Sequence, residues 1–204
     1  MSEEELMEAW PIFVVGQVGT DLDTEVLDSD NAVELSDILQ SFDAFLKVHY
    51  FDYVENPEDL GEIGAGAANV GPEFTEFEFK SLKELVGIEE ALAKKGEIST
   101  PSNFMEVLSE ALKDSSRWKK WLKPEEKDKD FFELDEERRD WLLSTGARYV
   151  WGDSDVIESR SVLYENLKAE GYLPETIVES RIESAIDRYY HSFNLKNTGR
   201  LLKR

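Results

Sequence analysis

Three short apolar runs in the first half of the chain are each followed by polar residues that could bind a ligand. The run IFVV is followed by a glycine and a glutamine, and the run AFLKV leads into a histidine and an acid. A third run, GAGAANVGP, is rich in glycine and alanine. Short apolar runs are typical of strands in parallel sheets, whose binding groups gather at the carboxyl ends of the strands. The candidate substrate-binding residues are Gln17, Asp21, His49, Asp52, Asn69, Gly71 and Glu73.

These residue types allow two kinds of binding. An imidazole such as that of His49, with Asp52 three residues later, can hold a metal, carry a proton or contact a hydroxylated ligand. Asn69, Gly71 and Glu73 lie on a glycine-rich turn before a predicted helix, where backbone amides can cradle a phosphate. Each position also has a purely structural interpretation. His49 would then only hold its loop, and Glu73 would itself occupy the positive end of the helix.

The spacing of apolar residues predicts alternating strands and helices in the first half of the chain. Strands are expected at residues 12–15, 45–49 and 67–70, and helices at 28–42 and 75–92. The glycines and prolines between residues 54 and 74 predict a loop. A strand, a helix and a second strand in this order form the βαβ unit of a parallel sheet.

From Ser102 onward only helical periodicity remains. Helices are expected at residues 103–113, 134–151, 156–170 and 174–193. We therefore predict an α/β domain over residues 1–98 and a helical extension over residues 99–204. A short helix is also expected within residues 2–10, and the basic end NLKNTGRLLKR is interpreted as solvated or partner-contacting.

Composition limits the possible functions. The 204 residues include 41% hydrophobic residues, enough for a sizeable core, and no cysteine, which excludes disulfides and thiolate chemistry. Only His49 and His191 could join carboxylates around a metal. No apolar run approaches about 18 residues and no secretory leader is present, so a cytoplasmic location is expected. A net charge of -22 repels phosphate backbones and anionic lipid, so nucleic-acid and membrane partners are not expected.

Several ordered stretches resemble one known family. FVVGQVGTDLDTE, HYFDYVENPE, AANVGPEFTEFEF and IEEAL, followed by RWKKWL, LSTGARYVW and YENL, occur in the order and spacing of that family. The chain resembles the class II D-tagatose-1,6-bisphosphate aldolase non-catalytic subunits, which are TIM barrels with a helical C-terminal segment. Gln17 and Asp21 match the family stretch Q-P-G-V-E-F only in part, because the proline is absent and the acid is Asp.

The resemblance implies the C-terminal part of a TIM (β/α)8 barrel. Residues 12–16, 45–49 and 67–70 would be its last three parallel strands, followed by the helical segment. A complete barrel takes about 250 residues, and three strands cannot close one. A protein partner is therefore expected: a catalytic aldolase subunit, a separate barrel half or a second copy of the chain. A truncated gene product is the rival explanation.

The implied function is carbohydrate metabolism with a sugar phosphate of the tagatose or galactitol type. The resemblance implies that the chain supports the stability and activity of a catalytic aldolase subunit. The zinc-binding histidines with which class II aldolases catalyse are absent from this sequence, and so are a P-loop, G-x-G-x-x-G and a nucleophile elbow. The alternative is a sugar-acid or sugar-phosphate epimerase or isomerase, using a divalent metal with His49 as a candidate ligand, or an inactive fragment of either kind of protein.

Overall fold

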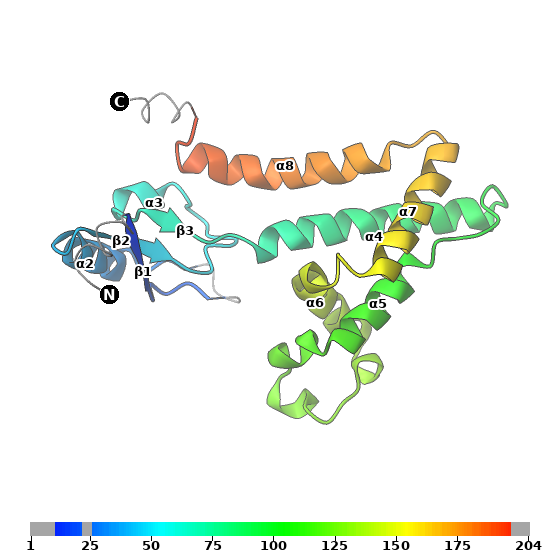
Figure 1. Cartoon of the computed structure of the whole chain (residues 1–204), viewed down its shortest axis with the longest axis horizontal. Helices are drawn as coiled ribbons and strands as arrows, with labels where there is room; N and C mark the ends of the chain where they lie inside the picture. Colours follow the sequence, from blue (N-terminus) through cyan, green and yellow to red (C-terminus); the bar gives the residue numbers. More distant parts are fainter. Residues whose placement is uncertain (1–10, 22–25, 197–204) are drawn as a thin grey trace. The chain divides into compact units, whose positions relative to one another are not determined.

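The fold begins with a three-stranded parallel sheet. The computed structural model describes residues 11–21 and 26–196, so the helix predicted within residues 2–10 and the last part of the basic end lie outside the described residues. Strands β1 (Ile12–Gly16), β2 (Ala44–Val48) and β3 (Ala67–Ala68) pair in the order β1-β2-β3 (Figure 1). Both pairings are parallel, with Ile12 opposite Ala44 and Lys47 opposite Ala67. The predicted side-by-side, parallel arrangement of the three runs is confirmed.

Helix α2 (Ser29–Gln40) covers one face of this sheet. Asp28 caps its first turn, accepting a hydrogen bond from the Asn31 amide at 3.1 Å. The side chains of β2 that face α2 are buried, and Leu46 and Val48 have no exposed surface. Burial of these side chains is the main force that holds the helix on the sheet.

The opposite face of the sheet, which we call the open face, is only partly covered by the residues that the structure describes. The alternation of side chains along a strand places Phe13, Val15, Phe45 and Lys47 on this face, and the rings of Phe13 and Phe45 lie 5.9 Å apart. The exposed fractions of Phe13 and Val15 are 43% and 53%. An edge strand with such exposed apolar side chains is unusual in a protein that works alone.

The segment between β2 and the next long helix differs from its prediction in two places. A single helical turn, α3 (Asp59–Glu62), forms where a loop was expected, with Leu60 buried beneath it. Strand β3 has two residues rather than the predicted four. Helix α4 (Pro72–Lys94) begins three residues earlier than predicted, because Pro72 suits the first helical turn and ends the strand pairing.

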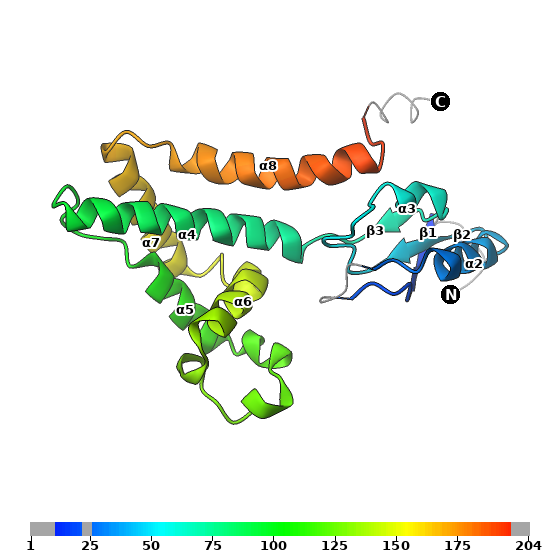
Figure 2. The same cartoon turned by 180° about the vertical axis from the view of Figure 1, so that it is seen from behind.

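The rest of the chain is helical. Helices α5 (Phe104–Ser115), α6 (Glu136–Gly146) and α7 (Ser154–Ala169) pack with α4 around one core, as the opposite views in Figures 1 and 2 show. Phe104, Leu108, Leu112, Leu142, Leu163 and Leu167 of these helices have no exposed surface. The last helix is α8 (Pro174–Ser192). The predicted α/β class with a helical C-terminal segment is confirmed.

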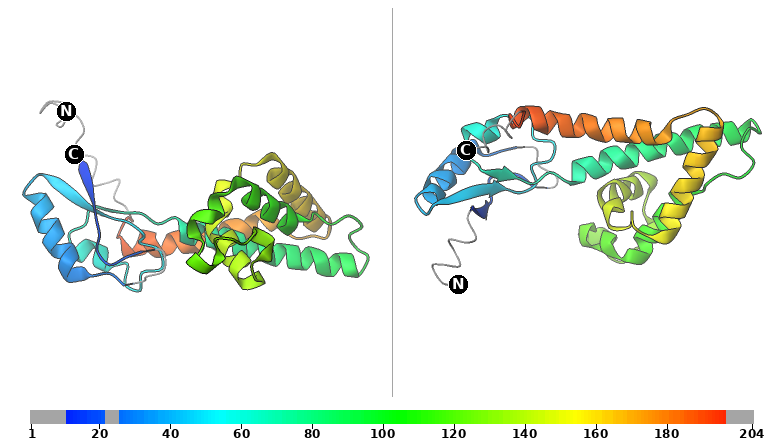
Figure 3. Two further views of the ribbon diagram at one scale, coloured as in Figure 1. Left: turned by 90° about the horizontal axis from the view of Figure 1, so that it is seen from below. Right: turned by 45° about the horizontal axis from the view of Figure 1, so that its top comes forward.

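Short 3-10 helices connect α5, α6 and α7. They are η1 (Arg117–Trp121), η2 (Pro124–Glu126), η3 (Phe131–Glu133) and η4 (Ala147–Tyr149), and Figure 3 shows this part of the chain from two further sides. The buried rings of Trp118 and Phe131 meet edge to face at 5.3 Å. Arg138 binds the buried Glu126 carboxylate through two nitrogens, which ties η2 to α6. The stretch KPEEKDKD, which lies between the helices predicted at residues 103–113 and 134–151, is therefore held at Glu126.

The contacts divide the chain into two compact units. Unit 1 comprises residues 1–73 and 186–204, and unit 2 comprises residues 74–185. Helices α4 and α8 each contribute residues to both units. The division of the chain into residues 1–98 and 99–204 stays a prediction. In the described part of the chain, every helix is too short or too polar to span a membrane.

Candidate functional site at the strand ends

The loop after β2 supplies a carboxylate that caps helix α4. One oxygen of Asp52, Oδ1, accepts hydrogen bonds from the backbone amides of Gly71 at 2.9 Å and Glu73 at 2.8 Å. Asp52 is 8% exposed. The first amides of a helix carry partial positive charge and have no partner within the helix. Asp52 therefore occupies the N-terminus of α4, where the sequence analysis offered backbone amides as a phosphate-binding site.

Glu73 joins this loop to the C-terminal helix. Its side chain is almost fully buried, and its Oε2 accepts hydrogen bonds from the Tyr53 amide at 2.8 Å and from the Tyr189 hydroxyl. Its Oε1 lies 3.3 Å from a guanidinium nitrogen of Arg188. A buried carboxylate is stable only when its charge and lone pairs are satisfied in this way.

Arg188 and Tyr189 complete a network that we call the Glu73 cluster, consisting of Asp52, Glu73, Arg188 and Tyr189. Arg188 also donates a hydrogen bond to the carbonyl oxygen of Val54. Burial, and then the adjacent Glu73 carboxylate, raise the pKa of Tyr189 far above its ordinary value. Its phenol therefore stays protonated and remains a hydrogen-bond donor to Glu73.

His49 has an exposed side chain. Its backbone carbonyl accepts a hydrogen bond from the Thr20 hydroxyl at 2.7 Å, which links the loops after β1 and β2. Its ring meets the Tyr50 ring edge to face at 5.8 Å. In the residues that the structure describes, no group of three or more His, Cys, Asp or Glu side chains is placed to hold a metal ion. A metal role for His49 stays a prediction.

The other candidates also lie at strand ends in unit 1. The side chain of Gln17 accepts a hydrogen bond from the Gly19 amide at 3.1 Å, and Asp21 is exposed. Asn69 is exposed as well, and its backbone pairs with Val48 at 2.9 Å and with Phe51 at 2.9 Å. The structure thus joins Asp52, Gly71 and Glu73 through hydrogen bonds. It leaves the side chains of Gln17, Asp21, His49 and Asn69 at the surface.

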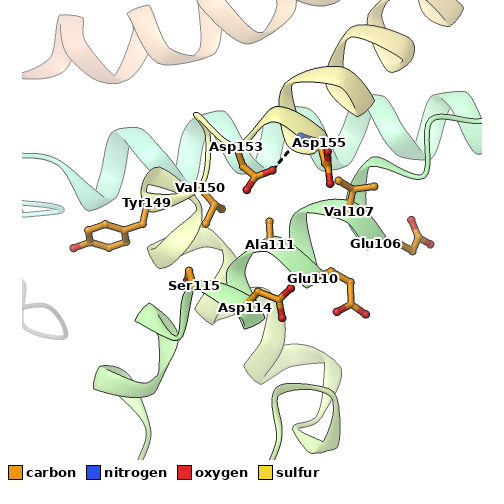
Figure 4. Close-up of a pocket in the computed structure, with 10 residues that line it drawn as sticks. All are labelled: Glu106, Val107, Glu110, Ala111, Asp114, Ser115, Tyr149, Val150, Asp153 and Asp155. Atoms are coloured by element: carbon orange, nitrogen blue, oxygen red, sulfur yellow. Dashed lines mark hydrogen bonds between the residues drawn. The ribbon is translucent and has the colours of Figure 1, made fainter.

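A groove of about 640 Å³ lies in unit 2, between α5 and the turn that leads into α7 (Figure 4). Five carboxylates line it, with Tyr149 at its border and Val107, Ala111 and Val150 on its walls. Asp153 caps α7 by accepting a hydrogen bond from the Asp155 amide at 3.0 Å. The carboxylates are those of Glu106, Glu110, Asp114, Asp153 and Asp155. None of the candidates predicted from the sequence lines this groove.

Comparison with protein families decides the relationship that the motifs suggested. Residues 2–200 match the family described as D-tagatose-1,6-bisphosphate aldolase subunit GatZ/KbaZ-like. The chain belongs to this family. No curated protein matches the chain. Membership of the GatZ/KbaZ-like family assigns the chain to carbohydrate metabolism, in a family of subunits that associate with an aldolase partner.

Sequence reasoning missed two members of the Glu73 cluster. Arg188 and Tyr189 belong to the helical segment of this GatZ/KbaZ-like chain, and the pair Tyr189–Glu73 is separated by 116 positions. Local spacing carries no signal for such a contact. The only available indication was chemical: a carboxylate at the start of a buried helix needs a cation or a hydroxyl nearby.

Proposed function

We propose that this chain is a non-catalytic subunit that supports a D-tagatose-1,6-bisphosphate aldolase in sugar-phosphate metabolism. Family membership supports the assignment to carbohydrate metabolism and to an aldolase assembly. The observation that carries the supporting role is the open sheet face, where Phe13 and Val15 on β1 are 43% and 53% exposed. A partner that covers this face would remove apolar surface from water and pair the edge of β1 that none of the described strands pairs.

We infer that the partner supplies further strands, which extend the three-stranded sheet of this chain into a barrel. The three parallel strands with α2 on one face have the layer order of a barrel wall, in which helices lie outside and the other face points inward. We infer that Phe13, Val15, Phe45 and Lys47 face the interior of such a barrel. The partner can be the catalytic subunit, another barrel half or a second copy of this chain.

Contact with the sugar phosphate is the second element of this proposal. Gln17, Asp21, His49 and Asn69 have surface side chains at the strand ends, where barrel proteins bind their ligands. Asp52, Gly71 and Glu73 are engaged in hydrogen bonds with the chain itself, so we assign them to the framework of the site. Carboxamide and imidazole groups of the first set would contact substrate hydroxyls.

Association with a catalytic class II aldolase subunit tests the supporting role. The chain and the aldolase subunit are co-expressed, and their complex is measured by size-exclusion chromatography with light scattering. The natural sequence should form the complex. The Val15→Lys variant should not form it, because the lysine places a charge on the open face. Val33→Lys is the matched control, because Val33 is 41% exposed on α2, away from this face.

Two results would contradict the supporting role. One is a natural chain that is monodisperse, stably folded and unable to bind the aldolase subunit. The other is a complex that forms equally well with Val15→Lys and Val33→Lys.

Substrate contact is tested separately with His49→Ala, which should leave the complex intact and weaken substrate-induced thermal stabilisation of that complex. An unchanged stabilisation would remove His49 from the site.

A further inference from the structure

Three cations of unit 2 surround the hydroxyl and ring of one tyrosine. The Lys120 ammonium donates a hydrogen bond to the Tyr149 oxygen at 2.8 Å, and the Arg148 guanidinium donates another at 3.3 Å. The guanidinium carbon of Arg117 lies 5.5 Å from the centre of the same ring. Lys120 and Arg117 come from η1, whereas Arg148 and Tyr149 come from η4. The fold thus brings two basic stretches of the sequence together at Tyr149.

The contacts of these three cations are to the Tyr149 hydroxyl and to its aromatic ring. Within residues 11–21 and 26–196, no carboxylate forms a salt bridge with Arg117, Lys120 or Arg148. Elsewhere in the same unit, Lys83 pairs with Asp140 and Arg181 with Glu84. A chain with 45 acidic and 23 basic residues offers acids in excess. Three cations that lie close together without a carboxylate partner repel one another, and a bound anion would reduce this repulsion.

We propose that Lys120, Arg148 and Tyr149 form a binding site for a compact phosphate group, with Arg117 at its edge. Lysine and arginine are the side chains that bind phosphate most strongly, through charge-assisted hydrogen bonds. The Tyr149 oxygen accepts hydrogen bonds from both cations and keeps its own O–H as a further donor. Tyr149 is 41% exposed, so an anion can reach this group from solvent. This site does not depend on the proposed aldolase association.

The surroundings limit the size of the anion. Tyr149 also borders the acidic groove, and Figure 4 shows its ring directed away from the carboxylates of Asp114 and Asp153. These carboxylates would repel a long polyanion such as a nucleic acid. A single phosphate group is small enough to stay on the cationic side of Tyr149. The source of that group is free phosphate or a small phosphate ester.

Titration of Tyr149 gives the site its own spectroscopic signal. The hydrogen bonds from Lys120 and Arg148 lower the pKa of Tyr149 below its ordinary value. A bound phosphate would offset these positive charges and raise the pKa again. Ultraviolet absorbance of the phenolate, taken as the difference from Tyr149→Phe, isolates this residue from the other six tyrosines.

Calorimetric titration of the full chain with inorganic phosphate, at constant ionic strength, tests the site. Saturable binding is expected for the natural sequence. Lys120→Gln and Arg148→Gln should each bind about tenfold more weakly, since each removes one charge-assisted hydrogen bond. Lys95→Gln is the matched control, because Lys95 is exposed, lies in the same unit and loses the same charge.

Glycerol 3-phosphate, titrated in parallel, distinguishes the two sources of the phosphate group. Tighter binding of glycerol 3-phosphate than of inorganic phosphate assigns the site to phosphate esters, and equal binding assigns it to free phosphate.

Two results would overturn the site. The first is the absence of saturable phosphate binding by the natural chain, whatever the variants do. The second is an equal loss of affinity in Lys95→Gln, since this would show attraction by net charge alone. Circular dichroism melting verifies that each variant is folded. If a glutamine variant does not fold, Tyr149→Phe replaces it, because it keeps both cations and loses only the phenol.

Discussion

The hydroxyl of Tyr189 donates a hydrogen bond to the buried carboxylate of Glu73, 116 positions earlier in the chain. Both residues belong to unit 1, whose sheet and first loops come from the start of the sequence. The end of α8 is thus fastened to the residues that follow β2 and β3. Since Asp52 caps α4 beside Glu73, the loops that carry the candidate site share one hydrogen-bonded framework.

Tyr189→Phe should destabilise the chain by about 1.5–3 kcal/mol. The substitution removes a hydrogen bond to a buried charged group and leaves the Glu73 carboxylate less well satisfied. The free energy of unfolding is measured by urea denaturation. Tyr190→Phe serves as the control, because Tyr190 is 38% exposed and is its immediate neighbour. Equal stabilities of the two variants would argue against the importance of this bond.

Asp52→Ala should cost about 0.5–2 kcal/mol, the range measured when a capping side chain is removed from a helix. Its carboxylate serves two amides at the start of α4, and the alanine side chain cannot replace it. The same denaturation experiment applies, with Glu55→Ala as a control in the exposed part of this loop. If the free energy of unfolding fell by less than the uncertainty of the fit, water would be able to bind the two amides as well as the carboxylate does.

Much of the fold could be predicted from local patterns. The apolar runs near residues 12 and 45 became β1 and β2, and the helix expected over residues 28–42 is α2. Such features depend on neighbours in the sequence, which periodicity and capping rules describe well. The start of α4 was predicted too late because Pro72, which opens the helix, was counted with the loop, and because the capping residue Asp52 lies 21 residues before Glu73.

The candidate site was less accessible to prediction. Sequence patterns placed polar residues at strand ends, but they could not separate those with internal partners from those at the surface. Glu73 is held by Tyr189 and Arg188, whose distance in sequence hides the contact. The cations around Tyr149 were missed for the same reason, because Lys120 and Tyr149 are 29 positions apart. Tertiary contacts of this kind give no periodic signal.

The stability of the chain should fall as the pH rises above about 10. Burial raises the pKa of Tyr164 to about 12, whereas an unfolded tyrosine titrates near 10. Between these values the unfolded state releases the proton and the folded state retains it, so alkali favours unfolding. Urea denaturation at a series of pH values from 8 to about 12 measures this loss.

Tyr164→Phe isolates the contribution of this one tyrosine. The variant should lose part of the pH dependence above about 10, because phenylalanine does not titrate. Tyr172→Phe is the control, since Tyr172 is 37% exposed in the turn before α8. An unchanged slope in Tyr164→Phe would show that its phenol titrates in the folded state as it does in the unfolded chain.

Gly66→Ala should destabilise the sheet by about 1–3 kcal/mol, the usual cost of overpacking. A Cβ atom at Gly66 would lie 2.7 Å from the Cβ atom of Phe45, which is fixed to the backbone of β2 and cannot turn away. The Gly66 amide donates a hydrogen bond to the Leu46 carbonyl at 3.0 Å, so the clash pushes apart the backbones that this bond joins. Gly61→Ala is the matched control, because its Cβ would meet no atom within 4 Å and alanine favours the α3 helix. Thermal melting of the two variants should therefore shift in opposite directions, and a Gly66→Ala chain as stable as the natural one would contradict the close approach of β3 to Phe45.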